Sequence, residues 1–548
     1  MFPRYLLASL LALAVDYALY LFLLWVAAGL APAQAAAPAY FMGALVHYFV
    51  SRRFVFSEGW LHRHRLGELM AFLASGRFGM ALTSGVICLV SAIPGAGIHW
   101  PKIVAIGMSF GATYLVRKHL IFATVLPVAF EEHSTWQRAG WAAAVGLVAV
   151  AMRLGAILYW GEPDLPRSVD QGEYVALGQN VRLHGSFSYG YPHPWGARAK
   201  LDSSGPFEPT AARAPGYPFL IAALWWEDAP PMLQVQLAQA AMGSTVAVLV
   251  YLMALQAFGL GTAVIAGLAM ALAPLSLYMT TVLLTETLFT FLMTVSVWFW
   301  TRRQGVPAGL FLGAATLTRA AALPLIAAVL LIGLLLKSDR WRNLKLGLVA
   351  LAIVAPWTVR NAVTMGAFIP VANVGFGANM LFGTIDVPYG SGNEFVTFIQ
   401  DPDVARIMAA GPTPQDGERQ MGSVAMERIL AAPLDWLWVR LKQYPRYWLG
   451  TGYFISPNFA VKYGSVAASA VFWVLVAAGM LLARRRWREL YPLALCPIVT
   501  SAAHFVGSAE ERYSLGVVPM AAIFAAYAVT ALRLRQAPKG PRRLLTQT

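Results

Sequence analysis

The sequence predicts an all-α protein that crosses a membrane many times. Of its 548 residues, 58% are hydrophobic and only 12% are charged, whereas soluble domains average about 45–50% apolar and about 25% charged residues. Apolar runs long enough to span a bilayer recur along the whole chain, and basic clusters separate them. This composition excludes a soluble enzyme.

An excess of basic residues accompanies the apolar runs, with 41 Lys and Arg against 26 Asp and Glu and a net charge of +15. Membrane proteins keep basic loops in the cytoplasm, which gives such an excess without any nucleic acid. One alternating order of spans places every basic cluster, and both ends of the chain, on the cytoplasmic side. We therefore expect the lipid bilayer as a partner and no nucleic acid.

Four apolar runs open the chain, at residues 5–30, 37–50, 68–91 and 100–116. The first run is too long for the core of a cleaved signal peptide, which has about 7–15 residues, and it contains Asp16. We interpret it as a retained span. The runs predict a four-span module over residues 1–125, followed by a cytoplasmic linker over residues 126–137.

An internal repeat supports this module. The segment YFVSRRFVF at 48–56 recurs as YLVRKHLIF at 114–122, and Leu-Ala-Ser at 7–9 recurs at 73–75 with the same offset. Cytoplasmic helix ends commonly carry basic and aromatic residues, but nine aligned positions with only similar substitutions favour a true repeat. Because both basic copies end on the same side, the pattern predicts two hairpins in parallel repeat.

These segments resemble the GtrA-like family of small four-helix membrane proteins. The resemblance rests on Asp16-Tyr17 within the first span, on residues 52–56 and on residues 117–122. It implies a module that handles polyprenyl-phosphate-linked sugars and that moves or delivers them. The candidate functional residues of the module are Asp16, Arg52, Arg53 and Arg77.

A larger domain is predicted over residues 138–535, ahead of a basic cytoplasmic tail at 536–548. Its apolar runs fall at 139–159, 232–257, 260–279, 283–300, 306–319, 321–337, 344–359, 465–483, 491–507 and 514–532. Two polar segments rich in Gly and Pro, at about 160–215 and 360–463, lie outside the membrane in this topology. The second ends in an amphipathic pattern at 435–444, which predicts a helix at the interface. Chemistry is expected in these outside segments.

The first outside segment contains two carboxylates three residues apart, Asp170 and Glu173. They share a face if this stretch is helical, and a carboxylate held at a membrane surface can act as a general base. The alternative is that an extracytoplasmic loop only needs solvating acids. Farther on, residues 213–218 turn back toward the membrane through a rigid turn that contains two prolines.

Charged residues also lie at the outer ends of apolar runs. Glu286 is near the outer end of its span, where an ionisable group is costly and marks a functional candidate. Arg319, Arg360 and Arg512 lie at the same outer level and could bind a phosphate bidentately. The alternative for each arginine is a snorkelling side chain or a structural ion pair with a nearby glutamate.

Six motifs in order resemble the family of GT-C fold membrane glycosyltransferases, the group of protein O-mannosyltransferases and lipid A aminoarabinose transferases. They are Asp170 with Tyr174, residues 213–218, Thr285-Glu286, residues 317–319, residues 356–361 and residues 511–513. The resemblance implies a multi-span GT-C fold with mixed extracytoplasmic segments. It also implies a sugar donor carried on a polyprenyl phosphate, attacked from the extracytoplasmic side with inversion.

The resemblance also implies roles for individual residues. Asp170 would be the base that takes the acceptor proton, with Glu173 as a second catalytic candidate. The substrate-binding candidates are Tyr174, Arg213, Tyr217, Glu286, Arg319, Arg360 and Arg512. Gln171 follows Asp170 where the mannosyltransferases have an adjacent acid, so the assistance to the base and the use of a divalent metal stay open. We find no phosphate-binding Gly-rich loop and no dinucleotide motif.

The sequence thus predicts a polyprenyl-phosphate-sugar-dependent glycosyltransferase of a bacterial inner membrane, with cytoplasmic termini and an extracytoplasmic active site. The N-terminal module would handle or deliver the donor. The alternative is a transporter or flippase of the lipid-linked sugar, which Asp16 and Arg77 within spans would favour. A third hypothesis is an extracytoplasmic assembly or sensory protein. The sugar and the acceptor, whether a lipid, a glycan or a protein hydroxyl, are not specified.

Overall fold

The computed structural model describes most of the chain. The described residues are 2–26, 42–56, 134–161, 168–190, 205–226, 229–372, 375–387, 394–411, 414–450 and 459–534, with single positions between 68 and 122. The chain divides into two compact units, the first comprising Met1–Ala129 with Val466–Ala470 and Ala531–Thr548, and the second Phe130–Ser465 with Val471–Thr530. The predicted candidate Arg77, most of the predicted linker and the basic tail lie outside the described residues.

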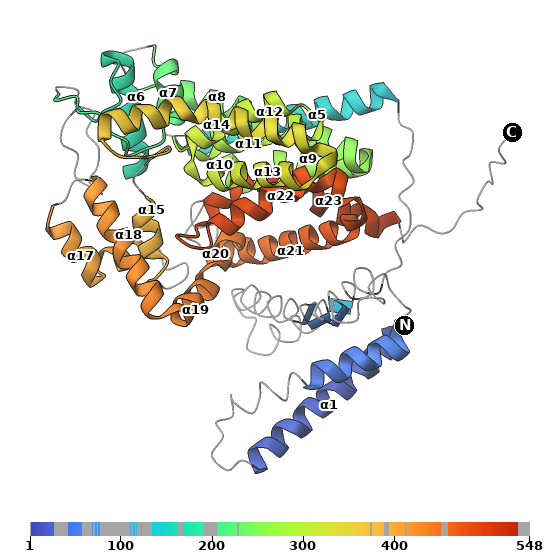
Figure 1. The fold of residues 1–548 in the computed structure, drawn as a ribbon. Coiled ribbons are helices and arrows are strands. Elements are labelled where there is room, and N and C mark those ends of the chain that lie inside the picture. Colours follow the sequence, from blue (N-terminus) through green and yellow to red (C-terminus); the bar gives the residue numbers. More distant parts are fainter. Residues whose placement is uncertain are drawn as a thin grey trace. The chain divides into compact units, whose positions relative to one another are not determined.

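Helices form all the regular structure of the described residues. Long apolar helices pack side by side in the larger unit (Figure 1): α5 (Thr135–Trp160), α8 (Met232–Phe258), α9 (Leu260–Ala271), α10 (Pro274–Tyr278), α11 (Glu286–Thr301), α12 (Gly305–Thr318), α13 (Leu323–Leu335), α14 (Arg340–Met365), α21 (Phe459–Ala483), α22 (Trp487–Ala503) and α23 (Val518–Leu534). Short 3₁₀ turns connect several of them: η3 (Ala320–Ala322), η4 (Lys337–Asp339), η5 (Arg484–Arg486) and η6 (Glu511–Gly516).

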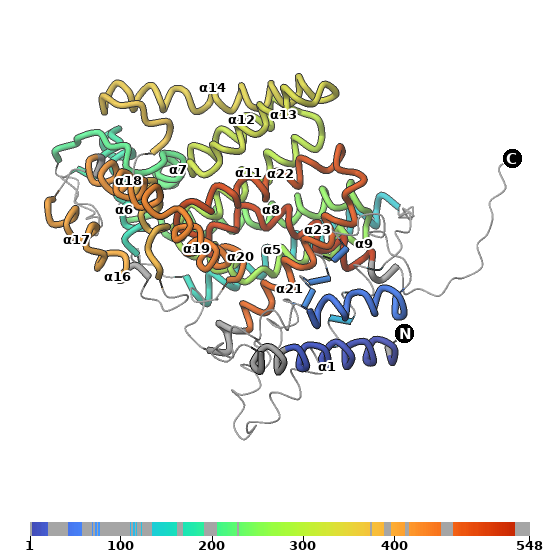
Figure 2. Tube along the Cα trace, turned by 60° about the horizontal axis from the view of Figure 1, so that its bottom comes forward, coloured from blue at the N-terminus to red at the C-terminus, as the bar shows by residue number. Residues whose placement is uncertain are grey.

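Shorter helices gather at one end of this bundle in both views (Figure 1, Figure 2): α6 (Val169–His184), α7 (Gly216–Leu224), α15 (Phe376–Phe382), α16 (Glu394–Ile399), α17 (Pro402–Ala409), α18 (Pro414–Ala431) and α19 (Pro433–Gln443). The turn α20 (Pro445–Trp448) then leads toward α21. Segments far apart in the sequence, before α8 and after α14, thus meet at the same end.

Several helices are long and apolar enough to cross a membrane. Among the described residues these are Thr135–Trp160, Met232–Phe258, Lys337–Met365 and Gly464–Ala503, and shorter apolar helices accompany them. A helix of 26 residues is roughly 39 Å long at about 1.5 Å per residue, which exceeds the hydrocarbon core of about 30 Å. The prediction of an all-α membrane protein is confirmed.

A stripe of glycines lets α12 and α14 pack closely. Gly305, Gly309 and Gly313 recur every fourth residue and so share one face of α12. A Cβ atom on Gly309 would lie 2.5 Å from the carbonyl oxygen of Leu346, and one on Gly313 would lie 2.6 Å from Cβ of Ile353. Small residues at this spacing are a common way for membrane helices to bring their backbones together.

In the smaller unit, the two copies of the sequence repeat end in the same backbone turn. The amide of Phe56 donates to the carbonyl of Ser51 at 2.9 Å, and the amide of Phe122 donates to the carbonyl of Arg117 at 3.0 Å. Both bonds join residues five apart, as in a π-helical turn. The rings of Phe56 and Phe122 stack with centroids 4.6 Å apart. A repeated local structure therefore accompanies the repeated sequence.

A buried arginine lies in the centre of this smaller unit. The Arg117 side chain is buried, and its Nε donates to the hydroxyl of Ser75 at 2.9 Å. Its Nη1 donates to the hydroxyl of Tyr5 at 2.9 Å and lies 3.0 Å from Nδ1 of His47. The guanidinium carbon lies 3.7 Å from the centroid of the Phe72 ring. Sequence reasoning did not single out this group as functional.

The predicted residues of the N-terminal module that the structure describes, Asp16, Arg52 and Arg53, occupy other positions. Arg52 forms an ion pair with the buried Glu68 at 3.1 Å. Arg53 is exposed. Asp16 on α1 (Phe2–Val26) lies close to Gly43, where a Cβ atom would approach Cβ of Asp16 to 2.8 Å. Their functional roles stay predictions.

We predict that replacing Gly309 by Leu destabilises the larger unit by about 1–3 kcal/mol, because the new side chain would overlap the α14 backbone. Thermal unfolding in detergent measures the effect. The matched control is Gly155→Leu on α5, since a Cβ atom at Gly155 would meet nothing within 4 Å. Equal unfolding temperatures for the two variants would contradict the close packing of α12 on α14.

Candidate active site

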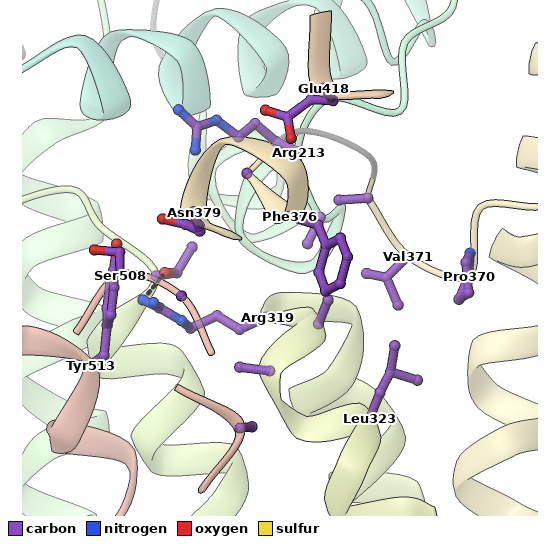
Figure 3. A pocket seen from close by; sticks show the side chains of 18 of the residues that line it. Arg213, Arg319, Leu323, Pro370, Val371, Phe376, Asn379, Glu418, Ser508 and Tyr513 are labelled. Carbon is purple, nitrogen blue, oxygen red and sulfur yellow. Dashed lines mark hydrogen bonds between the residues drawn. The ribbon is translucent and has the colours of Figure 1, made fainter. Parts of the chain in front are cut away.

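A cavity of about 800 Å³ lies where the shorter helices meet the bundle. Figure 3 shows part of its lining, with Arg213, Arg319, Tyr513, Asn379 and Glu418 around a common space. Its lining includes the charged side chains of Asp170, Arg213, Glu286, Arg319, Glu418, Arg419 and Arg512. It also includes apolar side chains, among them Leu323, Pro324, Phe368, Ile369, Val371 and Phe376. The cavity can therefore hold a ligand that has both charged and apolar parts.

The first outside segment contains a helix that carries the two predicted carboxylates. The hydroxyl of Ser168 accepts from the amide of Gln171 at 3.4 Å and caps α6. Asp170 lies in the first turn, where the helix dipole stabilises a negative charge. The side chain of Gln171 accepts from the amide of Leu283 at 3.0 Å. The residue at which this chain departs from the mannosyltransferase pattern thus fixes α6 to the segment before α11.

Arg213 holds both carboxylates of α6. Its Nη2 donates to Oδ1 of Asp170 at 2.7 Å, and its Nε donates to Oε2 of Glu173 at 2.5 Å. The sequence allowed the two carboxylates to share a face if this stretch were helical. The stretch is helical, and Asp170 and Glu173 face the same partner from one side of α6. Glu173 is nearly buried, with a side chain 8% exposed, whereas the Asp170 side chain is 31% exposed.

A second arginine reaches Asp170 from the far end of the sequence. Both terminal nitrogens of Arg512 lie 3.3 Å from Oδ2 of Asp170. Nε of Arg512 donates to Glu510 at 2.6 Å and lies 3.8 Å from Glu286. Burial raises the pKa of Asp170, but the charges and hydrogen bonds of Arg213 and Arg512 outweigh it and hold the pKa at about 2. Asp170 is therefore ionised at neutral pH.

Glu286 and Arg319 form a second ion pair in the same cavity. Nη1 of Arg319 donates to Oε1 of Glu286 at 2.8 Å and to the hydroxyl of Thr285 at 3.0 Å. Glu286 begins α11, and Arg319 follows α12 in an extended conformation. The helix therefore ends before Arg319. The guanidinium of Arg319 also lies 4.7 Å from the centre of the Tyr513 ring, a favourable cation–π distance.

The structure brings together most of the residues that the sequence singled out. Asp170, Tyr174, Arg213, Glu286, Arg319 and Arg512 line the cavity. Tyr217 does not line it: its ring packs edge-on against Tyr174, with centroids 5.4 Å apart, and its hydroxyl donates to Gln239.

Arg360 lies apart from the other two predicted phosphate-binding arginines. Its Nη1 donates to the carbonyl of Thr210 at 2.6 Å, and the guanidinium lies 4.8 Å from the centre of the Trp357 ring. Arg360 is not among the residues that line the cavity. These contacts fix the segment before α7 to the end of α14.

Several lining residues carried no sequence signal. His504 lies at the end of α22, with its ring between Tyr447 and Tyr513 at centroid distances of 5.1 and 5.3 Å. Asn379 and Glu418 come from the second outside segment, where no motif marks them. Tyr513 belonged to a recognised motif, and its contact with Arg319 gives it a position in the site. Only the tertiary fold brings the others to the cavity.

The question of a metal ion stays open. Within the described ranges, no group of three or more His, Cys, Asp and Glu residues gathers in a way that could hold one. Asp170, the candidate base, and the neighbouring acid Glu173 both face the guanidinium of Arg213. Ligation of a cation by this pair would require Arg213 to move.

We predict that Arg213→Met destabilises the protein at pH 7 by about 2 kcal/mol, because two carboxylates would lose their shared partner. Asp170 has a lowered pKa, so its contribution is present above the ordinary value of 3.8 and is lost as the pH falls toward about 2. The difference in the free energy of unfolding between the variant and the native protein should therefore become smaller as the pH falls from 3.8 toward about 2. Thermal unfolding at pH 7, 5 and 3 checks it.

The matched control for this variant is Arg406→Met, which breaks an exposed ion pair with Asp403. That pair should contribute less than about 1 kcal/mol. A pH-independent loss of stability in Arg213→Met would show that packing, and not charge, explains its effect.

Two family models match this sequence. Residues 4–122 match the model for the GtrA/DPMS transmembrane domain, and residues 213–359 match the model for dolichyl-phosphate-mannose-protein mannosyltransferase. Among curated proteins, none matches by sequence. The second matched region contains Arg213, Glu286 and Arg319, whereas Asp170 and Arg512 lie on either side of it.

The solved structures that resemble this chain are distant in sequence. One is the oligosaccharyltransferase AglB from Archaeoglobus fulgidus in complex with an inhibitory peptide and a dolichol-phosphate, at 15% identity and a TM-score of 0.44, covering 75% of this chain and 53% of that one. Another is ArnT from Cupriavidus metallidurans bound to undecaprenyl phosphate, at 16% identity and a TM-score of 0.31, covering 72% of this chain and 77% of that one. The chain thus spans about half the length of the oligosaccharyltransferase.

The sequence matches fall in different units, the first in the unit that contains Arg117 and the second in the unit that contains the cavity. This chain is therefore similar to a GtrA/DPMS transmembrane domain over residues 4–122 and to the dolichyl-phosphate-mannose-protein mannosyltransferase family over residues 213–359.

Proposed function

We propose that the protein is a membrane glycosyltransferase that moves a sugar, hexosyl or pentosyl, from a polyprenyl-phosphate donor to an acceptor hydroxyl with inversion. The observation that carries the proposal is one cavity in which the carboxylate of Asp170 lies beside Arg512, with the Glu286–Arg319 pair next to it. A base and an anion-binding group at short range are what such a transfer requires.

Arg319 and Arg512 are the arginines placed to hold the donor phosphate. In the donor the phosphate is a diester with one negative charge, and the leaving lipid phosphate gains a second. Guanidinium groups therefore stabilise the transition state more than the bound donor, which accelerates the reaction. Arg512 now contacts Glu510, whose side chain is 41% exposed. Glu510 can turn to water when a phosphate takes its place.

Asp170 then acts as the base. It accepts the proton of the acceptor hydroxyl, the acceptor oxygen attacks the anomeric carbon, and the bond to the phosphate oxygen breaks on the opposite face. With its pKa held at about 2 by both arginines, Asp170 is a weak base. When a phosphate engages Arg512, part of this positive charge is neutralised, and the pKa of Asp170 rises. Donor binding thus prepares the base.

The remaining predicted residues support this arrangement. Glu286 orients Arg319, and Glu173 holds Arg213 against Asp170. Arg360 positions the segment before α7 through its contact with Thr210. The positive-inside pattern of the sequence supports a site on the extracytoplasmic side of a bacterial inner membrane, with both termini in the cytoplasm.

We predict that Asp170→Asn lowers transfer by about 10²–10⁴-fold while retaining lipid-phosphate binding, because only the base is lost. Mass spectrometry of co-purifying lipids is the measurement. The variant should retain a polyprenyl phosphate that still carries its sugar, whose mass also identifies the donor.

The control is Asp403→Asn, an exposed acid on α17 outside the cavity lining. Turnover of Asp170→Asn within about tenfold of the native rate would reject the base assignment. Arg319→Ala should instead lose lipid-phosphate binding itself, which separates the two roles.

We further propose that the N-terminal module handles the lipid donor and delivers it to the glycosyltransferase. Arg117, with hydroxyl groups of Tyr5 and Ser75 on its guanidinium, is a buried cationic group suited to a phosphate. Joining the two domains in one chain keeps them at an effective concentration of about millimolar, which favours transfer of a scarce lipid between them.

We predict that Arg117→Met in the full chain lowers transfer several-fold at limiting donor and leaves the rate at saturating donor unchanged. The reason is that delivery limits the reaction only when donor is scarce. Initial rates over a range of donor concentrations check this. Arg4→Met, at an exposed position of the same module, is the control. A uniform loss at every donor concentration would argue for a structural role.

The transporter hypothesis is tested by the same donor in liposomes. The full chain with Asp170→Asn cannot complete transfer, so any movement of a polyprenyl-phosphate sugar between leaflets reports transport alone. Movement of the lipid that Arg117→Met abolishes would favour a flippase module. No movement of the lipid would favour a module that only binds the donor and delivers it.

A further inference from the structure

Helices α15 to α18 lie together at the end of the bundle where α6 and α7 also lie (Figure 1, Figure 2). Residues of α15 and α18 line the cavity, and we call these four helices the cap. The cap has its own apolar core, which includes Leu381, Phe398, Val404 and Met421. Since this core does not depend on the charged residues of the site, the cap is a separate surface facing the same cavity. Its side chains on that surface are Phe376, Asn379, Glu418 and Arg419.

The backbone under this surface is held firmly. Gly377 packs so tightly on α18 that a Cβ atom there would overlap the carbonyl oxygen of Glu418. The Glu418 carboxylate also accepts hydrogen bonds from the amides of Gly377 and Ala378, at 2.8 and 3.1 Å. Phe376 and Asn379 flank this anchored turn, so their positions relative to Glu418 are fixed.

Phe376 presents a large apolar ring to the cavity. It is 76% exposed although other aromatic residues of the cap, such as Phe398, are buried in its core. Figure 3 shows the ring among the lining side chains, between Asn379 and Val371. An exposed ring at a fixed position inside a cavity provides a flat surface for a ligand to stack on.

Planar polar groups surround this ring. Asn379 and Arg419 are exposed to the cavity, and in the part of the chain that the structure describes neither side chain has a hydrogen bond or an ion pair. The amide of Asn379 and the guanidinium of Arg419 each offer donors in one plane, and the amide oxygen of Asn379 offers an acceptor. Two donors or acceptors in one plane match neighbouring hydroxyl groups of a ring.

We propose that this surface of the cap is a carbohydrate-binding subsite, in which Phe376 stacks on the C–H face of a sugar ring and Asn379 and Arg419 bind its hydroxyls, while Glu418 anchors the turn that carries Phe376. A lipid tail would leave the polar groups without partners, and a bare phosphate would leave the exposed Phe376 ring without one. The subsite rests on the proposed function, because it places a sugar ring in the cavity that holds Arg319 and Arg512. The ring belongs either to the donor or to a glycan acceptor.

The experiment compares two lipids on the native full chain and its variants: a polyprenyl phosphate, and the same lipid carrying mannose, glucose or a pentose. The native protein should bind one sugar-bearing lipid about tenfold more tightly than the bare lipid. Phe376→Ala and Asn379→Ala should remove most of this gain and leave the dissociation constant of the bare lipid unchanged. Leu430→Ala, an exposed apolar residue of α18 outside the cavity lining, is the control.

A second arm distinguishes the acceptor as the source of the sugar. With the donor site filled, saturation-transfer NMR detects the methyl glycosides of mannose, glucose and galactose. A glycoside signal that Phe376→Ala and Asn379→Ala abolish places an acceptor sugar in the subsite. If the two variants instead remove the tighter binding of the sugar-bearing lipid in the first experiment, the subsite holds the donor sugar. Either result supports the proposal.

The proposal is overturned if the two variants change neither the affinity gain for the sugar-bearing lipid nor the glycoside signal. It is also overturned if they weaken binding of the bare lipid as much as binding of the sugar-bearing lipid. Failure of the native protein to bind any polyprenyl phosphate would instead reject the proposed function. The subsite would then survive only if a methyl glycoside still binds in a Phe376-dependent way, so the two failures are distinguishable.

Discussion

The shared ion pair of Asp170 with Arg213 and Arg512 is the interaction on which the rest of the site depends. It joins α6, the segment before α7 and η6, which are separated by up to 342 positions in the chain. The network continues through Arg512 to Glu286 and Arg319. Carboxylate and guanidinium groups therefore alternate along it. Each charge is stabilised by its neighbours, because a lone charge at a membrane boundary would carry a large desolvation cost.

This network also sets the chemistry that the site can perform. In the proposed mechanism, Arg512 both stabilises the ionised Asp170 and holds the donor phosphate, so the two tasks compete for one guanidinium group. The low pKa of Asp170 keeps this carboxylate ionised in the absence of donor. An anionic donor would neutralise part of the positive charge and make the carboxylate more basic, so the proposal couples binding energy to catalysis through Arg512.

How far sequence reasoning reached can be judged from particular residues. Asp170 and Glu173 were predicted to share a helix face, and they do, because spacing within a helix is a local property. Glu286 and Arg319 were placed at one membrane level by counting spans, and they form an ion pair. Arg360 was predicted at the same level, yet it contacts Thr210 outside the cavity lining. Membrane depth follows from hydropathy, but rotation about the helix axis depends on packing.

The sequence by itself determined the membrane class, the order of the apolar helices and the repeat in the N-terminal module, since these follow from composition and periodicity. It also singled out acidic and basic residues as candidates for the site. Only the tertiary structure decided which charges pair, that Arg117 is buried against Tyr5 and Ser75, and that Phe376 and Asn379 line the cavity from the second outside segment. The physical reason is that these contacts join segments of unrelated sequence, and their geometry comes from close packing such as that of Gly309 on α14 and Gly377 on α18.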